Sequence, residues 1–282
     1  MRKVPTETYE RIDNRLYDAE GDSWWQPDSS FYQLKVAFNP VRVGYARRKL
    51  LDELHLDPRG KKALEVGCGG GFVCEEIARM GFDTTGVDPS ERSLQIAIRH
   101  ARASGLDMRY ERATGESLPY PDESYDVVLC CDVLEHVRDL PQVISEVSRV
   151  LKPGGVFFYD TLNRTWLSKL VAIKIGQEWK RWAFMPPRLH VWDMFITPRE
   201  MKSLLRQHDL EWKEHRGMKP GVALVRALAT LRQRAKGGCT YAALGEKMKL
   251  VESRFTAVMY LGYAVKGPAR IGDLSSTEER DG

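Results

Sequence analysis

The chain has 282 residues, a formal net charge of +4, and 43% hydrophobic and 29% charged residues. This length fits one elaborated domain or two small ones, and the composition excludes a disordered or fibrous protein. No stretch reaches the roughly 18 apolar residues that span a bilayer, and the N-terminus lacks the apolar segment of a secretory signal.

Charge and tryptophan are distributed unevenly along the chain. Residues 1–160 carry 21 basic and 27 acidic side chains, whereas residues 161–282 carry 22 basic and 12 acidic ones. Five of the seven tryptophans also lie in the second part. The sequence therefore predicts an acidic core followed by a basic, aromatic portion. The odd number of cysteines, without a Cys-x-x-Cys pair, disfavours a zinc site or disulfide framework and indicates a reducing, cytosolic compartment.

The first 60 residues are expected to form helices around an aromatic flap. Tyr9, Ile12 and Leu16 recur at helical spacing, and residues 41–56 form a second helical stretch. Residues 22–40 are rich in Trp, Phe and Tyr but are interrupted by prolines, which predicts a lid.

From Lys62 the pattern alternates between strands and helices. Strands are expected at residues 63–66, 84–87, 108–111, 125–130 and 156–159, and helices at 72–80, 91–104 and 140–151. Repeated β–α units of this length predict a parallel sheet with helices on both faces. Ligands in such sheets bind at the carboxyl ends of the strands, near the switch in strand order.

This alternation ends after Asp160. Residues 163–187 form an insertion, residues 198–207 a helix with Thr197 as its N-cap, and residues 257–266 a last strand. The basic stretch 217–254 has no clear assignment. The predicted regions are an N-terminal helical lid (1–60), a ligand-binding core (61–160), an insertion with C-terminal elements of the same domain (161–270) and a disordered tail (271–282).

A glycine-rich loop, Glu65-Val66-Gly67-Cys68-Gly69-Gly70-Gly71, lies between the first strand and helix of the core. Glycines let the backbone approach a bound nucleotide closely. Phe72 stands where a dinucleotide fingerprint has its third glycine, which disfavours NAD. The second strand ends in Asp88, whose carboxylate can accept two hydrogen bonds from a ribose diol. A turn followed by an acidic helix cap is the alternative interpretation.

These motifs resemble the S-adenosylmethionine site of the seven-stranded class I methyltransferases. The matching segments are LEVGCGGG, GVDPS, Thr114–Pro119, Asp126–Val128 and the turn Lys152–Gly155. The resemblance implies a Rossmann-like α/β fold with N-terminal helices and an insertion after strand five. Many members carry Asp where this chain has Thr114, so the adenine contact is expected from the backbone or from Glu116. The implied cofactor contacts in this region are Glu65, Gly67, Gly69, Asp88, Pro89, Gly115 and Glu116.

Three further segments resemble the 3-demethylubiquinol O-methyltransferases of ubiquinone synthesis. They are Trp24-Trp25 with Phe38–Arg42, then Cys130–Val137, and the insertion from Asn163 through His190 to Pro198. The matching arginine of that branch touches the methionine carboxylate, so the resemblance implies Arg42 as a clamp; a surface arginine is the alternative. It also implies that Cys131 contacts the cofactor through its backbone. The resemblance weakens after about residue 215.

The residues after strand four carry the candidate chemistry. Asp132, Glu135 and His136 form Asp-x-x-Glu-His, and relatives in the ubiquinone branch carry a similar triplet assigned to Mg²⁺. Carboxylates suit a hard cation, although a metal-free substrate pocket is the alternative. His136 is then either a ligand or a base. His190 is the second candidate base, or a packing residue. Methyl transfer to a phenol requires alignment of both partners and removal of the phenolic proton.

The resemblance implies an O-methyltransferase acting on a polyprenylated quinol or catechol. Residues 166–185 combine Trp and Leu with Lys and Arg, which favours peripheral contact with the inner face of the membrane by a cytoplasmic protein; a helix packed on the sheet is the alternative. A soluble acceptor of another pathway is a second hypothesis. An RNA methyltransferase that uses basic residues 213–254 is a third, although we expect no nucleic-acid partner because the sequence has no recognised RNA-binding module. The sequence does not predict an oligomeric state.

Overall fold

An eight-stranded sheet forms the centre of the computed structural model, which describes residues 3–19 and 23–268. The strand order is β3-β2-β1-β4-β5-β8-β6-β7. The strands are β1 (Lys62–Val66), β2 (Asp83–Asp88), β3 (Arg109–Arg112), β4 (Tyr125–Cys131), β5 (Leu151–Leu162), β6 (Leu210–Pro220), β7 (Leu250–Ser253) and β8 (Met259–Lys266). The predicted α/β class is confirmed, but the expected seven strands are extended by β7 at the edge next to β6.

The strand order reverses between β1 and β4. β1 pairs in parallel with both β2 and β4, while β3 and β5 continue outward in the two directions. β8 then enters antiparallel to β5 and to β6. The loops after β1 and β4 therefore diverge at the carboxyl edge of the sheet, where α/β proteins bind ligands.

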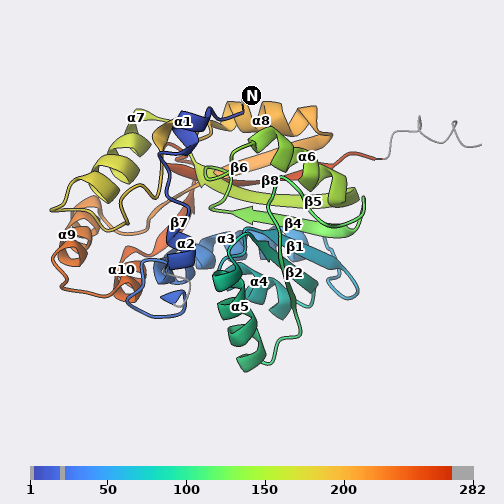
Figure 1. The fold of residues 1–282 in the computed structure, drawn as a ribbon, viewed down its shortest axis with the longest axis horizontal. Coiled ribbons are helices and arrows are strands. Elements are labelled where there is room, and N and C mark those ends of the chain that lie inside the picture. Colours follow the sequence, from blue (N-terminus) through green and yellow to red (C-terminus); the bar gives the residue numbers. More distant parts are fainter. Residues whose placement is uncertain (1–2, 20–22, 269–282) are drawn as a thin grey trace, which may run out of the picture.

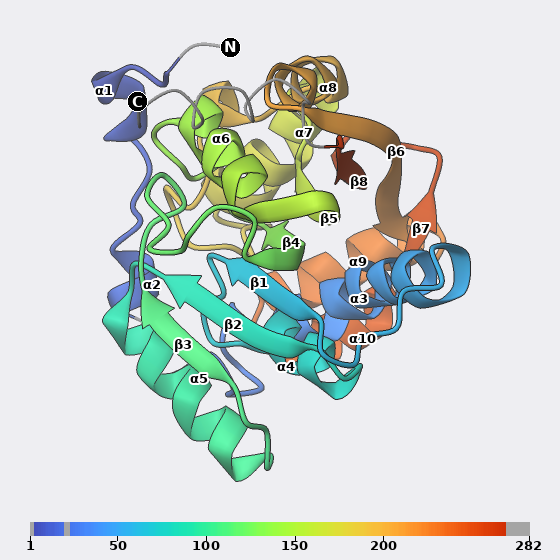
Figure 2. The same ribbon diagram turned by 90° about the vertical axis from the view of Figure 1, so that its right-hand side faces the viewer.

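Helices cover both faces of the sheet (Figure 2). On one face lie α3 (Asn39–Arg47), α4 (Phe72–Arg79) and α5 (Glu91–Ala103), and on the other α6 (Leu140–Val150) and α8 (Pro198–Gln207). Successive side chains of a strand point to opposite faces. Thus Val128 of β4 packs in the cluster with α6 and α8, whereas Val127 and Leu129 pack in the cluster with α3 and α4. Burying each such side chain contributes roughly 1.5–3 kcal/mol.

Local signals set the start of α8 as the sequence predicts. The Thr197 side chain accepts a hydrogen bond from the Glu200 backbone N–H, and the Glu200 carboxylate accepts one from the Thr197 N–H. Such a capping box satisfies two N–H groups that a helix leaves unpaired. The predicted N-cap is confirmed.

The N-terminal region differs from the expectation of one helix over Tyr9, Ile12 and Leu16. It forms two short helices, α1 (Thr6–Tyr9) and α2 (Leu16–Ala19), followed by η2 (Leu34–Phe38), α3 and η3 (Arg48–Glu53). Ile12 leaves the helical path and packs in a small cluster with Val191 and Met194. The Asp13 N–H donates to the Arg188 carbonyl, so tertiary contacts replace the continued helix.

The predicted lid lies directly on the glycine-rich loop. Trp24 stacks on Phe31 with ring centroids 4.3 Å apart, and its indole N–H donates to Ser93 Oγ. Trp25 donates to the Gly70 carbonyl at 2.9 Å. Residue 22 of the predicted lid lies outside the described residues.

The insertion and the basic stretch form separate helical elements on one side of the molecule (Figure 1). The insertion contains α7 (Trp166–Ser168), η4 (Lys169–Glu178) and η5 (Trp192–Met194), while the basic stretch forms α9 (Leu224–Ala235), α10 (Tyr241–Met248) and β7. Ala172, Ile173 and Gly176 are buried, so the insertion packs on the protein, while Trp166 and Trp179 are exposed. The predicted disordered tail, 271–282, lies outside the described residues.

Candidate methyl-donor site

A cavity of about 400 Å³ opens at the carboxyl ends of β1, β2 and β4. Its volume falls within the range of small-molecule sites, roughly 300–1,000 Å³. The residues predicted to bind the cofactor all line this cavity: Arg42, Glu65, Gly67, Gly69, Asp88, Pro89, Gly115, Glu116 and Cys131. Asp132 and His136 line it as well.

The glycine-rich loop turns sharply beneath the lid. Gly67 has φ 73° and Gly69 φ 50°, left-handed values that favour glycine. A Cβ at Gly69 would come within 2.6 Å of the Trp24 ring, and one at Gly67 would clash with Val133. At these two glycines the backbone itself, without a side chain, therefore forms part of the cavity wall.

Asp88 fixes the loop through its carboxylate. One oxygen accepts from the Gly69 N–H at 2.9 Å and the other from the Ser90 N–H at 2.9 Å. Burial raises the pKa of Asp88 to about 6, although these two donors oppose the shift. A carboxylate oxygen can accept more than one hydrogen bond, so each retains capacity for a ligand hydroxyl.

Two other predicted carboxylates are also tied to backbone N–H groups. Glu65 accepts from the Cys74 N–H in the first turn of α4 at 2.8 Å, and burial raises its pKa to about 8. Glu116 accepts from the Arg138 N–H at 3.1 Å. Glu116 thereby joins the cavity wall to the segment that follows His136.

Arg42 is buried, so the alternative of a surface arginine is wrong. Its guanidinium lies 2.5 Å from Asp132 Oδ2 and 3.2 Å from Asp160 Oδ2. Burial opposes the charge of Asp132, but Arg42 outweighs it and holds the pKa of Asp132 below its usual range. Burial raises the pKa of Asp160 to about 7 despite the same guanidinium. Arg42 therefore lines the cavity and forms a buried ionic cluster with Asp132 and Asp160.

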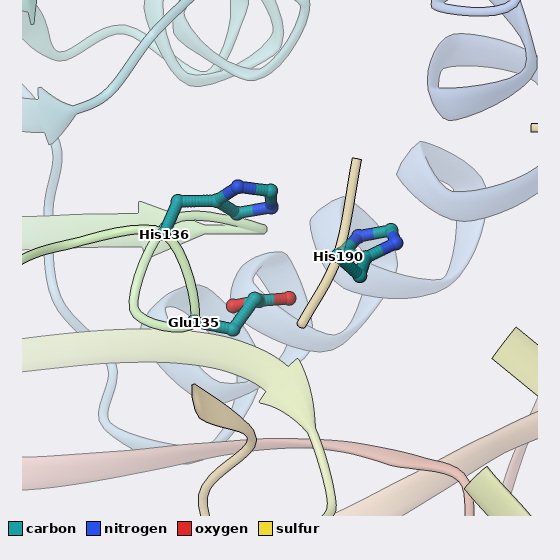
Figure 3. A group of neighbouring side chains, drawn as sticks. All are labelled: Glu135, His136 and His190. Carbon is teal, nitrogen blue, oxygen red and sulfur yellow. The ribbon is translucent and has the colours of Figure 1, made fainter. Parts of the chain in front are cut away.

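The structure does not assemble the predicted metal triplet as a unit. Glu135, His136 and His190 each present a ligand atom within 4.8 Å of the others, whereas Asp132 pairs with Arg42 (Figure 3). Asp132 has a positive φ of 55°, and its carboxylate is engaged by the Arg42 guanidinium instead. The grouping of Asp132 with Glu135 and His136 is thus replaced by one that includes His190.

The three grouped side chains keep unused polar atoms. Glu135 Oε2 accepts from the Thr161 hydroxyl at 2.9 Å, but Glu135 Oε1, His136 Nδ1 and His190 Nδ1 are buried without a hydrogen-bond partner among the described residues. Burial lowers the pKa of His136 to about 3 and that of His190 to about 4. Both imidazoles are therefore neutral at neutral pH, the form that can accept a proton or coordinate a cation.

Two residues at or beside the cavity were missed by the sequence-based predictions. Tyr17 lines the cavity, with its ring edge-on to His136 at 5.9 Å and stacked on Phe31 at 5.4 Å. Asp160 reaches Arg42 from the end of β5. Tyr17 could have been found from its position shortly before Trp24-Trp25, as a further aromatic residue of the same region. No sequence pattern indicated that Asp160 pairs with Arg42.

Comparison with known proteins gives concordant matches. Residues 64–159 match the family model described as a methyltransferase domain. The ubiquinone biosynthesis O-methyltransferase of Rhizobium etli is 36% identical over 77% of this chain and 89% of its own length. The enzyme of that name from Caulobacter vibrioides is 38% identical over 72% of this chain and 82% of its own length.

Solved structures with lower sequence identity share the fold. The YcgJ protein of Bacillus subtilis superposes with a TM-score of 0.55 at 15% identity, covering 80% of this chain and 98% of that protein. A SAM-dependent methyltransferase of Thermotoga maritima, a possible histamine N-methyltransferase, gives 0.55 at 20% identity and covers 92% and 99%. Together with the cavity at the strand switch, the sequence matches show that the chain belongs to the ubiquinone biosynthesis O-methyltransferase family of S-adenosylmethionine-dependent methyltransferases.

Proposed function

We propose that this enzyme transfers a methyl group from S-adenosylmethionine to a phenolic hydroxyl of a polyprenylated quinol or catechol. The observation that carries the proposal is the cavity of about 400 Å³ described above, hereafter the donor cavity. His136 is part of its lining and lies beside Glu135 and His190. The names of the curated relatives point to the same acceptor class.

The cavity residues fit the methyl donor by their chemistry. Asp88 would accept from the ribose hydroxyls, and Gly115 with Glu116 would border the adenine. At the other end, Arg42 offers paired donors to a carboxylate, while Glu65 and the carbonyls near Gly67 suit an ammonium group. The bound donor supplies a methyl group already activated on a sulfonium. Holding the two reactants in line can be worth roughly 7–11 kcal/mol.

The phenolic proton must leave as the new O–C bond forms. Of the two histidines, His136 lines the donor cavity and His190 does not. Their ring centroids are 5.1 Å apart. A nitrogen of His136 is therefore the better placed to accept the phenolic proton. We propose that, when no cation is bound, His136 takes the proton and His190 is its neighbour on the acceptor side.

A divalent cation also fits Glu135, His136 and His190. A carboxylate oxygen and two imidazole nitrogens that lack partners among the described residues form a donor set for such an ion. Bound there, a cation would lower the pKa of a phenolic oxygen and orient the two hydroxyls of a catechol. Imidazole suits Co²⁺ or Zn²⁺ better than Mg²⁺, so these residues predict a preference for a transition metal.

The function is tested by turnover of labelled S-adenosylmethionine with catechols and quinols of different tail lengths. We expect methylation of tailed catechols, suppression by EDTA, and recovery with Co²⁺ at a lower concentration than with Mg²⁺. If EDTA does not change turnover, the proposed cation is ruled out and His136 remains as the candidate base. Equal turnover of tailed and tailless acceptors would favour a soluble acceptor of another pathway.

We also propose peripheral contact with an anionic membrane through residues 166–185. Trp166 is 75% exposed and Trp179 is 47% exposed, and the adjoining Lys180 and Arg181 are exposed as well. Aromatic and basic side chains together suit the membrane interface. Of the helices in residues 3–19 and 23–268, none has the length and apolar character needed to cross a bilayer.

Helix α9 extends this surface. Leu224 and Val225 at its start are 72% and 80% exposed, and its Arg232 guanidinium lies 5.8 Å from the Trp182 ring of the insertion. Exposed apolar residues of this size are a typical feature of interaction surfaces when they lie close together.

Sedimentation with vesicles of neutral and anionic phospholipids tests the membrane contact. We expect the wild-type protein to bind and the binding to weaken with salt, because exposed charges are screened. The double variant Trp179→Glu/Trp182→Glu should lose most of this binding. Leu54→Glu, at a residue 42% exposed but outside the insertion, is the matched control and should bind normally. Wild-type protein that stays in the supernatant would contradict the proposal.

A further inference from the structure

A second cavity, of about 1070 Å³, lies between α1 and the insertion. Its innermost residues include Ile173, Gln177 and Val191, which are buried, while Ala183 and Met185 form half-buried walls. Charged residues such as Glu10 and Lys180 stand exposed at its mouth. The cavity thus has a mainly apolar interior and a charged rim.

This second cavity and the donor cavity lie on either side of two neighbouring histidines. His190 lines the second cavity and His136 lines the donor cavity, with their ring centroids 5.1 Å apart (Figure 3). The Gln177 side chain accepts a hydrogen bond from the His190 N–H at 2.7 Å and donates one to the His190 carbonyl at 3.3 Å. The insertion therefore holds His190 in the wall of the second cavity, next to His136 of the donor cavity.

The charges at the rim largely neutralise one another. Arg11 pairs with Asp193 at 2.7 Å, and Lys174 pairs with Glu178 on the same helix. The Lys169 ammonium lies over the Trp192 ring, 4.5 Å from its centroid. Because most of these cations have partners, the rim does not select a charged ligand. The apolar interior instead favours an aliphatic group, whose burial is favourable in proportion to its area.

We propose that this second cavity binds an aliphatic substituent of the methyl acceptor, with the acceptor ring placed at the histidine pair. An in-line displacement requires the acceptor oxygen to approach the methyl group from the side opposite the departing sulfur. The acceptor therefore needs space beyond the donor cavity, and the second cavity supplies it beside His190. This inference rests on the proposed transfer to a catechol and assigns the site that recognises the rest of the acceptor.

The variant Ala183→Trp tests this assignment by filling the cavity from its wall. The measurement is kcat/KM for two catechols, one without a side chain and one with an aliphatic chain of about ten carbons. We expect the wild-type enzyme to prefer the tailed catechol at least about tenfold, since each buried methylene contributes to binding. Ala183→Trp should abolish that preference by raising KM for the tailed catechol, with kcat/KM for the short one unchanged within about twofold.

Ala103→Trp is the matched control, because Ala103 is exposed at the end of α5, away from the insertion (Figure 1). It should retain the preference for the tailed catechol. Ala183→Phe repeats the test with a smaller ring, and thermal unfolding shows that each variant folds. Unchanged preference in folded Ala183 variants would overturn the assignment while leaving the proposed function intact. A wild-type enzyme that methylates neither catechol, or that methylates both equally well, would overturn the proposed function itself, and the assignment with it.

Discussion

Asp88→Ala is expected to lower the affinity for S-adenosylmethionine by at least about 100-fold in calorimetry. A hydrogen bond to a charged group is worth about 1.5–3 kcal/mol, so the loss of the two proposed ribose contacts would remove roughly 3–6 kcal/mol. Each 1.4 kcal/mol corresponds to a tenfold change in affinity. The same substitution frees the Gly69 and Ser90 N–H groups that Asp88 holds in the loop. Both effects lower the affinity for S-adenosylmethionine.

Asp83→Ala is the matched control, because Asp83 begins the same strand at its opposite end and forms an exposed pair with Arg109. It should bind the donor like the wild-type enzyme. Thermal unfolding of Asp88→Ala separates lost binding from lost structure. Near-normal affinity in the folded variant would refute the ribose assignment.

Donor affinity should also decline in acid. Burial raises the pKa of Asp88 to about 6, and the protonated carboxyl group has less capacity to accept hydrogen bonds than the carboxylate. Donor binding favours the ionised form, so affinity is full above pH 6 and falls as the pH decreases through that value. The Asp83→Ala control should show the same pH dependence as the wild-type enzyme.

His136→Ala is expected to lower kcat by about 10²–10⁴-fold, the usual range for loss of a general base. Donor affinity should remain within a few fold, because the proposed ribose and adenine contacts lie elsewhere in the cavity. The measurement combines single-turnover kinetics with calorimetry, so that the chemical step is separated from binding.

His208→Ala controls for the removal of a histidine from the same protein. His208 is the C-cap of α8, and its carbonyl accepts from the Ser148 hydroxyl, a contact that alanine preserves. This variant should keep its kcat. A kcat in His136→Ala that is close to the wild-type value would eliminate His136 as the base and as an essential cation ligand.

Features encoded in short segments were the ones that the sequence predicted best. The turn around Gly67 and Gly69, the strand end at Asp88 and the cap of α8 by Thr197 each depend on neighbouring residues. Their geometry follows from backbone conformation and capping, which short patterns record. The residues that line the cavity could be predicted as well, because parallel strands bring the ends of these segments to one edge of the sheet.

Features that depend on distant contacts were predicted less well. Asp132 pairs with Arg42, which lies 90 positions earlier, and the expected metal group lacks it. His190 joins Glu135 and His136 only because the insertion folds back across the sheet. Likewise, β7 is short and gains its stability from pairing with β6, so four residues of sequence gave little periodicity to detect.

The lid also has a kinetic consequence. Trp24 and Trp25 hydrogen-bond to Ser93 and to the glycine-rich loop, while Trp24 forms part of the cavity wall. The contacts that close the lid are thus the contacts that shape the donor site. We expect release of the demethylated donor to require these contacts to open, which would couple the turnover rate to motion of the segment that carries Trp24 and Trp25.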